Sequence, residues 1–290
     1  MEGIESVKIT VLVDNTTFYE GPILAENGLS LFVEAKSKDF SIRILFDTGL
    51  TGQPLIKNSE ELKIDLSLID IIVISHNHYD HTGGLLKVLE RSNKPLPIII
   101  HPDALKQKYA ILPSLGIKKL TYTGPPFSWE KVKEKGGIIV SSRSPLSIAE
   151  NIMVTGEIPR VTEFEKVKGF YIIEDHDFKK DLLFDDQALI LKIDDDLVMI
   201  TGCGHSGIIN TLQHGIKILD AEKIRAVIGG FHLMDASSET IENTIQELKK
   251  LEPEVVAPMH CTGFKAKKKI AETLPIAFKE LYCGDSIEII

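Results

Sequence analysis

Ser75-His76-Asn77-His78-Tyr79-Asp80-His81-Thr82 is the stretch of the sequence that decides the fold and the chemistry. The continuous apolar run 71–74 precedes it and is typical of a strand that is buried on both faces. In an extended segment, residues i and i+2 point the same way, so His76 and His78 can share one ion. Asp80 and His81 lie where the chain turns into a helix, and they can face a second ion.

A metal centre explains this pattern better than a run of surface histidines that caps a helix. The four potential ligands come directly after a buried strand and directly before Gly83-Gly84. Imidazole and carboxylate donors suit zinc, iron or manganese, and open coordination positions are typical of a catalytic site. We therefore expect two divalent metal ions as cofactors, with zinc as the first choice and iron, manganese or magnesium as alternatives.

The composition is that of an ordinary globular protein, with 43% hydrophobic and 26% charged residues in a chain of 290. A chain of this length can bury a large core unaided, so a metal would serve chemistry rather than hold the fold. The three cysteines are too few and too scattered for a secreted disulfide framework. The formal charge of −9 opposes binding to polyphosphate, and we do not expect nucleic acid as a partner.

The first residues lead directly into an expected strand, without the organisation of a signal peptide. No apolar run approaches the roughly 20 residues that are needed to cross a bilayer. We therefore expect a cytoplasmic location and no membrane partner. A small, anionic substrate is the expected partner, and the sequence is compatible with a homo-oligomer.

Strands and helices follow one another in both halves of the chain, which predicts an α/β fold. Expected strands cover 7–13, 30–34, 40–46, 71–74, 98–100, 188–193, 197–201, 226–228 and 255–257. We expect a single domain over 1–290, with a loop-rich insertion near 102–185. The residues with the most chemistry all follow strands, where open α/β sheets place ligands: Asp47, 76–81, 203–205, His232 and His260.

The motifs of this chain resemble those of one protein family. His76-Asn77-His78-Tyr79-Asp80-His81 matches the HxHxDH signature of the metallo-β-lactamase superfamily, and Phe46-Asp47-Thr48-Gly49 looks like its upstream turn. Further motifs resemble one branch, which takes its name from an archaeal enzyme that joins a dihydropterin to a ribofuranosylaminobenzene phosphate. These motifs are Gly156-Glu157-Ile158-Pro159-Arg160, Asp185-Asp186-Gln187-Ala188-Leu189, Thr201-Gly202-Cys203-Gly204-His205, Gly229-Gly230-Phe231-His232-Leu233 and Pro258-Met259-His260-Cys261-Thr262-Gly263.

The resemblance implies an αββα sandwich, in which two mixed sheets face each other, helices lie outside and two metals sit at one edge. It places His76 and His78 on one metal and Asp80 and His81 on the other. His260, which follows a late strand, matches the residue that completes the second site.

The chain departs from the family pattern at the usual bridging ligand. The superfamily has an Asp after Thr-Gly, whereas Cys203 follows Thr201-Gly202 here, and a separate motif for a third histidine is not evident. We therefore expect His205 to complete the first site and keep Cys203 as a second candidate. A cysteine there could bind zinc as a thiolate, and a small buried residue at a strand end is an equally good interpretation.

Four further roles follow from the motifs and their neighbours. We expect Asp80 and His232 to take part in catalysis; for His232, the roles of ligand, general acid and structural residue stay open. Asp47 is expected to orient a metal-bound histidine through its free ring nitrogen. Arg160 could pair a phosphate or carboxylate of the substrate, or form an exposed salt bridge.

Two metals lower the pKa of a bridging water and stabilise developing negative charge, so the expected function is metal-dependent hydrolysis of an ester, phosphodiester or related bond. The branch name implies an alternative, a transferase that joins a dihydropterin methyl diphosphate to a ribofuranosylaminobenzene phosphate. A domain that binds a metal or ligand without catalysis is a third hypothesis.

Overall fold

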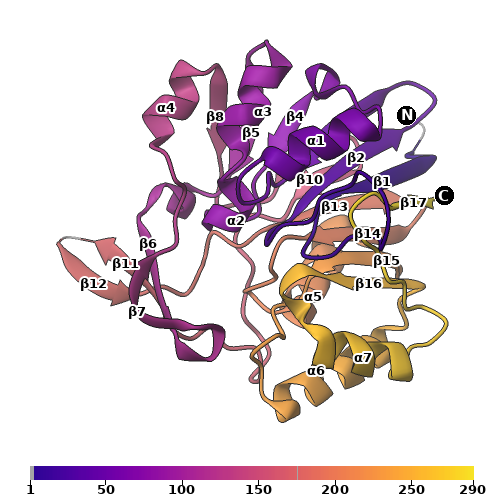
Figure 1. Cartoon of the computed structure of the whole chain (residues 1–290). Coiled ribbons are helices and arrows are strands. Elements are labelled where there is room, and N and C mark those ends of the chain that lie inside the picture. The colour runs from indigo at the N-terminus through magenta and orange to yellow at the C-terminus, as the bar shows by residue number, and fades with distance from the viewer. Residues whose placement is uncertain (1–2, 175) are drawn as a thin grey trace.

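Two mixed β-sheets face each other in the computed structural model, which describes residues 3–174 and 176–290 (Figure 1). The first sheet is antiparallel from β17 to β3 and parallel from β3 to β8. In spatial order its strands are β17 (Ser286–Ile289), β1 (Ser6–Val13), β2 (Ser30–Lys36), β3 (Ser41–Phe46), β4 (Ile71–Val73), β5 (Leu96–Ile100) and β8 (Gly137–Ser141).

The second sheet is parallel from β16 to β14 and antiparallel from there to β9. In spatial order its strands are β16 (Val255–Met259), β15 (Lys223–Gly230), β14 (Asp196–Thr201), β13 (Ala188–Ile193), β10 (Ile152–Val154) and β9 (Leu146–Ala149). Ile9 and Ile44 of the first sheet pack in one core cluster with Leu189, Ile200 and Ile228 of the second. Each such side chain stabilises the fold by about 1.5–3 kcal/mol through burial, before the entropy of folding is subtracted.

Helices cover the outer face of each sheet. On the first sheet lie α1 (Gln53–Glu61), α3 (Leu85–Ser92) and α4 (Trp129–Glu134), and on the second lie α5 (Ile208–Leu219), α6 (Ser238–Leu251) and α7 (Phe264–Thr273) (Figure 1). The αββα sandwich is therefore confirmed. None of the helices among the described residues is both long enough and apolar enough to span a bilayer.

The sequence of α6 shows why a helix forms there and what it covers. The Ser237 side chain accepts a hydrogen bond from the backbone N–H of Thr240 and so caps the first turn. Ile241, Ile245 and Leu248 are buried at helical spacing against the second sheet. The helix ends at a left-handed residue directly before Pro253, which cannot continue it.

The histidine motif and the later Cys and His residues lie at one edge of the sandwich, where the parallel strands end. The strands β3 and β4 end directly before Asp47 and the histidine motif, and β14, β15 and β16 end just before Cys203, His232 and His260. Because the carboxyl ends of parallel strands lie on the same side of a sheet, these loops meet. The short helix α2 (Tyr79–Thr82) continues from His78, so Asp80 and His81 lie in its first turn.

Residues 102–185, for which the sequence indicated long loops, hold the strands β8 to β10 and a third, smaller sheet at the side of the sandwich (Figure 1). The longest stretch there without a helix or strand covers 155–169. The smaller sheet has the order β12 (Asp177–Lys180), β11 (Phe170–Glu174), β6 (Lys108–Leu112) and β7 (Ile117–Tyr122). The remaining helical turns are η1 (Leu66–Leu68), η2 (Pro102–Leu105), η3 (Pro113–Leu115) and η4 (His260–Thr262).

A buried lysine attaches this smaller sheet to the histidine motif. Lys108 of β6 is 1% exposed, and its Nζ lies 2.6 Å from Asp181 Oδ2 and 2.7 Å from Asp185 Oδ1. Burial would lower the pKa of Lys108, but the charges of the two carboxylates outweigh it and raise that pKa. Asp185 also accepts a hydrogen bond of 3.0 Å from the backbone N–H of Asn77, so the ion network reaches the loop that carries the histidine motif.

We expect Lys108→Met to lower the free energy of unfolding by about 3–5 kcal/mol, because it leaves two buried carboxylates without their cation. Urea denaturation followed by circular dichroism measures this loss. Lys131→Met is the matched control, since Lys131 pairs with Glu134 on the surface and its removal should change the stability very little. Equal losses in both variants would contradict the role given to Lys108.

Candidate metal centre

Three histidines from two loops form the first group of donors, His76 and His78 after β4 and His205 after β14. His76 Nε2 lies 3.0 Å from His78 Nδ1, and both belong with His205 to a set whose donor atoms are within 4.8 Å of one another. Two nitrogens at about 2.0–2.1 Å from one tetrahedral zinc would be about 3.3 Å apart. The spacing therefore fits a shared ion, and the structure brings together the three residues that the sequence assigned to the first site.

The second group contains Asp80, His81 and His260, again with donor atoms within 4.8 Å of one another. Asp80 Oδ2 is 3.4 Å from His260 Nε2 and 4.0 Å from His81 Nε2. A hydrogen bond of 2.7 Å between His260 Nδ1 and Asn15 Oδ1 orients the His260 ring, so that its Nε2 faces Asp80. These are the residues that the sequence assigned to the second site, and they come together as expected.

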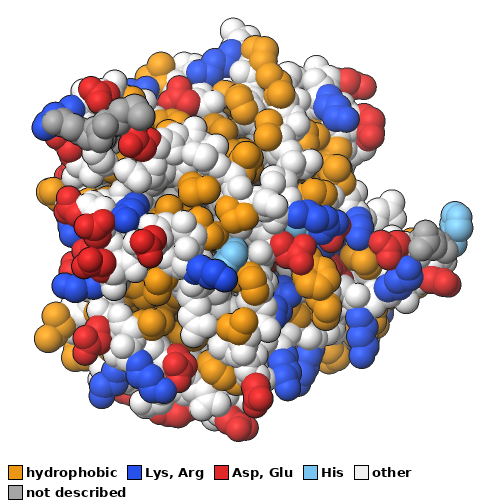
Figure 2. Space-filling view, turned by 180° about the vertical axis from the view of Figure 1, so that it is seen from behind, with side chains coloured by type: hydrophobic (Ala, Val, Ile, Leu, Met, Phe, Trp, Pro, Cys, Tyr) orange, Lys and Arg blue, Asp and Glu red, His pale blue; other side chains and the backbone are white. Residues whose placement is uncertain are grey.

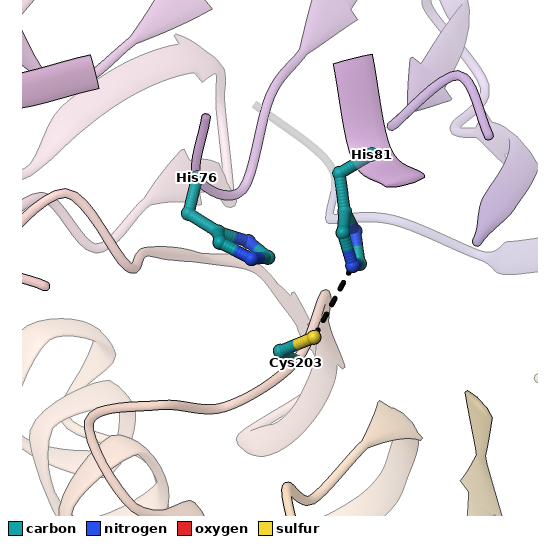
Figure 3. Close-up of side chains that lie close together, drawn as sticks. All are labelled: His76, His81 and Cys203. Atoms are coloured by element: carbon teal, nitrogen blue, oxygen red, sulfur yellow. Dashed lines mark hydrogen bonds between the residues drawn. The ribbon is translucent and has the colours of Figure 1, made fainter. Parts of the chain in front are cut away.

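Cys203 lies between the two groups. Its Sγ is 3.2 Å from His81 Nε2, and it forms one donor set with His76 and His81, which belong to different groups. Figure 3 shows the cysteine side chain reaching from its loop toward the two imidazoles. His205 therefore reaches the centre as predicted, and Cys203 occupies a more central position than the sequence alone indicated.

Asp47 lies against a ring nitrogen of His81, the kind of contact that the sequence predicted for it. Its Oδ2 lies 2.6 Å from His81 Nδ1 and accepts a hydrogen bond from Ser75 Oγ at 2.7 Å. The same Ser75 Oγ is 2.9 Å from His76 Nδ1, so one carboxylate and one hydroxyl orient a histidine of each group. Gly202 lies against this pair, and a Cβ there would come 2.0 Å from Ser75 Oγ.

Backbone strain is concentrated at the same edge. Asp47, His232 and His260 have φ angles of 57°, 47° and 45°, although none of them is glycine. The left-handed region is unfavourable for such residues and occurs where the surroundings enforce it, commonly at functional sites. The strain therefore supports the assignment of this edge as the functional one.

Burial keeps the first group in the neutral form that binds metals. It is the main cause that lowers the pKa of His78 to about 4 and the pKa of His76 and of His205 well below the usual histidine value. The neighbouring histidines lower the pKa of His76 and His205 further, because two imidazolium charges would repel each other. Neutral imidazole is the ligand form, so a cation does not have to displace protons there.

The second group favours positive charge, whereas the first group disfavours it. Burial alone would lower the pKa of His81, but the charges of Asp47 and Asp80 raise it to about 9. Burial would raise the pKa of Asp80, yet His81 and His260 hold it well below its usual range. The carboxylates thus attract positive charge to this position, and a metal ion can supply that charge in place of the His81 proton.

A cavity of about 610 Å³ opens beside the first group. His205 and His232 form part of its wall, together with Phe231, segment 163–168 and the start of α6. The rings of His205 and His232 are 4.1 Å apart between their centroids, and His232 also forms a donor set with Cys203 and His205. Burial would lower the pKa of His232, but the Cys261 thiol and the Asp235 charge raise it above its usual value.

Arg160 lies near the centre but is engaged by protein groups. Its guanidinium donates to Leu183 O and Ser206 Oγ, both at 3.1 Å, and stacks at 5.5 Å over the Phe184 ring. Its Nε and Nη1 atoms are buried and have no hydrogen-bond partner among the described residues. Arg160 is not one of the described residues that line the cavity of about 610 Å³. A contact between Arg160 and a substrate stays a prediction.

The donor set fits metal ions. Both ring nitrogens of His205 and Nε2 of His78 are buried without a hydrogen-bond partner among the described residues. Buried polar atoms without partners are unfavourable, and a metal ion satisfies such atoms. Imidazole, carboxylate and thiol donors in two adjacent groups suit zinc-like ions.

Two residues of the site were missed by the sequence interpretation. Cys261 forms a donor set with Cys203 and His260, and its position directly after His260 was a signal that could have been used. Phe170 stacks on His78 with a centroid distance of 5.1 Å. It lies in the smaller sheet, and a single aromatic residue there gives no recognisable pattern.

Comparisons with known proteins agree with this geometry. A family model described as a β-lactamase superfamily domain matches residues 42–147. The chain is 36% identical to the 7,8-dihydropterin-6-methyl-4-(β-D-ribofuranosyl)-aminobenzene-5'-phosphate synthase of Methanocaldococcus jannaschii, over 98% of this chain and 97% of that protein. MJ0448 of the same organism, described as uncharacterized, is 37% identical over 91% of this chain and 94% of its own.

One solved structure is similar over its whole length. Tm1679, described as a metal-dependent hydrolase of the β-lactamase superfamily, is 30% identical to this chain. Its TM-score is 0.78, and the match covers 98% of this chain and 99% of Tm1679. The fold and the donor groups therefore define an enzyme of the metallo-β-lactamase superfamily. Within it, the chain belongs to the family of the M. jannaschii synthase.

We expect His205→Ala to remove about one bound metal ion per chain, since a catalytic zinc commonly has three protein ligands and this change leaves two. Elemental analysis of reconstituted and dialysed protein measures the loss, and turnover should disappear with it. His176→Ala is the matched control, because His176 is exposed in the hairpin between β11 and β12. Full metal content and full activity in His205→Ala would remove His205 from the ligand set.

Proposed function

We propose that this chain is a hydrolase with a two-metal site that acts on an ester, phosphodiester or related bond of a small, anionic molecule. The observation that carries the proposal is the pair of adjacent donor groups beside a cavity of about 610 Å³. Two divalent ions, with zinc as the first choice, would activate water and stabilise developing negative charge. Their expected separation is about 3.5–4 Å.

The protein groups have separate tasks in this proposal. The first group would be completed by His205 and the second by His260, while Asp47 keeps the His81 ring turned toward the centre. Asp80 adds negative charge at the second position. His232 stands at the cavity wall with a raised pKa, which suits a group that donates a proton to the departing oxygen.

The size and lining of the cavity support an organic substrate larger than a simple phosphate. Phe164 and Phe231 provide apolar surface, while Lys166 and Lys168 lie beside acidic residues such as Glu163. On the face in Figure 2, basic and acidic side chains are interspersed without a continuous basic stripe. A molecule whose anionic end faces the metals and whose organic part fills the cavity meets these conditions.

A second candidate is a transferase that joins a dihydropterin methyl diphosphate to a ribofuranosylaminobenzene phosphate. It is favoured by the 36% identity to a synthase of this kind over nearly the whole chain. Departure of diphosphate also benefits from metal charge, so the same donor groups serve both reactions. The two candidates differ in the acceptor, which is water in one case and an aromatic ring in the other.

Diphosphate release from dihydropterin methyl diphosphate by zinc-loaded protein distinguishes the two candidates. Release without an acceptor indicates a hydrolase, and release that requires the ribofuranosylaminobenzene phosphate indicates the transferase. Phosphodiesters and lactones are assayed in parallel, because hydrolysis of these alone would support the hydrolase with another substrate. Asp80→Asn is the inactive control, and the absence of turnover on every substrate would contradict both candidates.

We expect His232→Asn to lower kcat by about 10²–10⁴-fold, the usual contribution of a general acid, with little change in KM. Because the pKa of His232 is raised, its protonated form persists above the usual histidine range, and activity should fall as the pH rises through that pKa. The pH–rate profile of the variant should lack this fall.

Two measurements separate a general acid from the other roles of His232. The variant should keep its metal content and recover much of its rate on a substrate whose leaving group needs no proton. Loss of metal would make His232 a ligand instead, and an unchanged kcat would leave it a structural residue.

A further inference from the structure

The position of Cys203 carries an inference beyond the proposed reaction. Its Sγ is within 4.8 Å of donor atoms of His76 and His205 in the first group and of His81 and His260 in the second. A ligand that touches only one ion has no reason to lie within this distance of donors from both groups. We propose that Cys203 is a bridging thiolate that binds both metal ions, so that a sulfur atom joins the two sites.

The carboxylates around the centre do not offer this bridge. Asp47 is fully buried, and its oxygens are engaged by Ser75 and His81. Asp185 binds Lys108 and the backbone N–H of Asn77 instead. Among the described donor sets, Asp80 provides the only carboxylate, and it belongs with the second group alone.

Asp186 does not belong to the donor sets of the described residues either: its Oδ2 accepts from the backbone N–H of Ser206, and its buried Oδ1 has no hydrogen-bond partner among them. Of the donor sets found among the described residues, the one that joins His76 of the first group with His81 of the second is completed by the Cys203 sulfur.

The second thiol of the centre has a different position. Cys261 donates to the Cys203 backbone oxygen at 3.4 Å and shares a described donor set only with Cys203 and His260. It is therefore close to the second group, without His76 or His78 in its set. Of the two sulfur atoms, Cys203 alone meets the geometry of a bridge.

The bridge has a defined chemistry. On metal binding, the Cys203 S–H bond breaks, two sulfur–metal bonds form and one proton leaves to solvent or buffer. A thiolate is a soft ligand and favours zinc, cadmium or ferrous ions over magnesium and calcium. The centre should therefore retain thiophilic ions in the presence of excess magnesium.

Cadmium NMR of protein loaded with cadmium tests the bridge without an activity assay. Sulfur ligation moves a cadmium resonance downfield of a site with nitrogen and oxygen ligands only. We expect two resonances, both downfield, and both should move upfield in Cys203→Ser. Cys283→Ser is the matched control: Cys283 is buried against Asp14 outside the donor sets, serine can make the same hydrogen bonds, and both resonances should stay in place.

Several outcomes would overturn the bridge. A shift of one resonance in Cys203→Ser means a terminal ligand, and a shift of neither means no ligand at all. Loss of both downfield shifts in Cys261→Ser assigns the bridge to the other sulfur. Binding of a single cadmium ion by the wild-type protein also rules the bridge out.

X-ray absorption of the zinc-loaded Cys261→Ser variant separates the alternatives if Cys203→Ser does not fold, because Cys203 is then the only sulfur in the described donor sets. In this variant a bridge gives on average about one sulfur per zinc at about 2.3 Å, and a terminal thiolate gives about half as many. The inference rests on the two-metal site of the proposed function, but different results would contradict the bridge and the proposed function. Two ions without sulfur ligation would leave the proposed function intact, whereas the absence of metal binding would remove both.

Discussion

The constraint on which this structure depends is the crowding of imidazole, carboxylate and thiol groups at one buried edge of the sandwich. Burial makes charge and unpaired polar atoms costly, as the lowered pKa values of His76, His78 and His205 show. The carboxylates Asp47 and Asp80 pull in the opposite direction and favour positive charge. Metal ions resolve both problems, because they satisfy the free nitrogens and balance the acidic side.

At this edge, loops from distant parts of the sequence are joined by hydrogen bonds and close contacts. The backbone N–H of Thr48 donates to the His81 carbonyl at 2.7 Å, next to the Asp47 carboxylate that orients the His81 ring. Gly83 and Gly84 permit this approach. A Cβ on Gly83 would lie 1.7 Å from the Leu50 backbone oxygen, and a Cβ on Gly84 would lie 2.2 Å from the Thr48 backbone oxygen. The glycines after the histidine motif therefore help to place the candidate metal ligands, although they offer no donor side chain themselves.

Features formed by residues close together in the sequence could be predicted, and features formed by contacts between distant segments could not. His76, His78, Asp80 and His81 could be assigned because they lie within one strand-to-helix turn, and the resemblance supplied the sandwich. Phe170 could not be assigned, because its contact with His78 joins segments far apart in the sequence. Cys261 was overlooked, although it directly follows His260. The smaller sheet was missed because its strands are short, and because β7 and β12 are largely exposed and lack a strong alternating pattern.

In the proposed function, the sandwich edge would supply the chemistry, and segment 102–185 would contribute to the recognition of the substrate. The strand ends supply the donors, and segment 163–168 walls the cavity beside them. That segment is fixed by Glu165, which accepts from the backbone N–H groups of Ile209 and Asn210 at the start of α5. M. jannaschii contains two relatives of this chain at 36% and 37% identity. Overall similarity therefore does not select one substrate, and the residues of this wall are where proteins that share these donors can differ in what they bind.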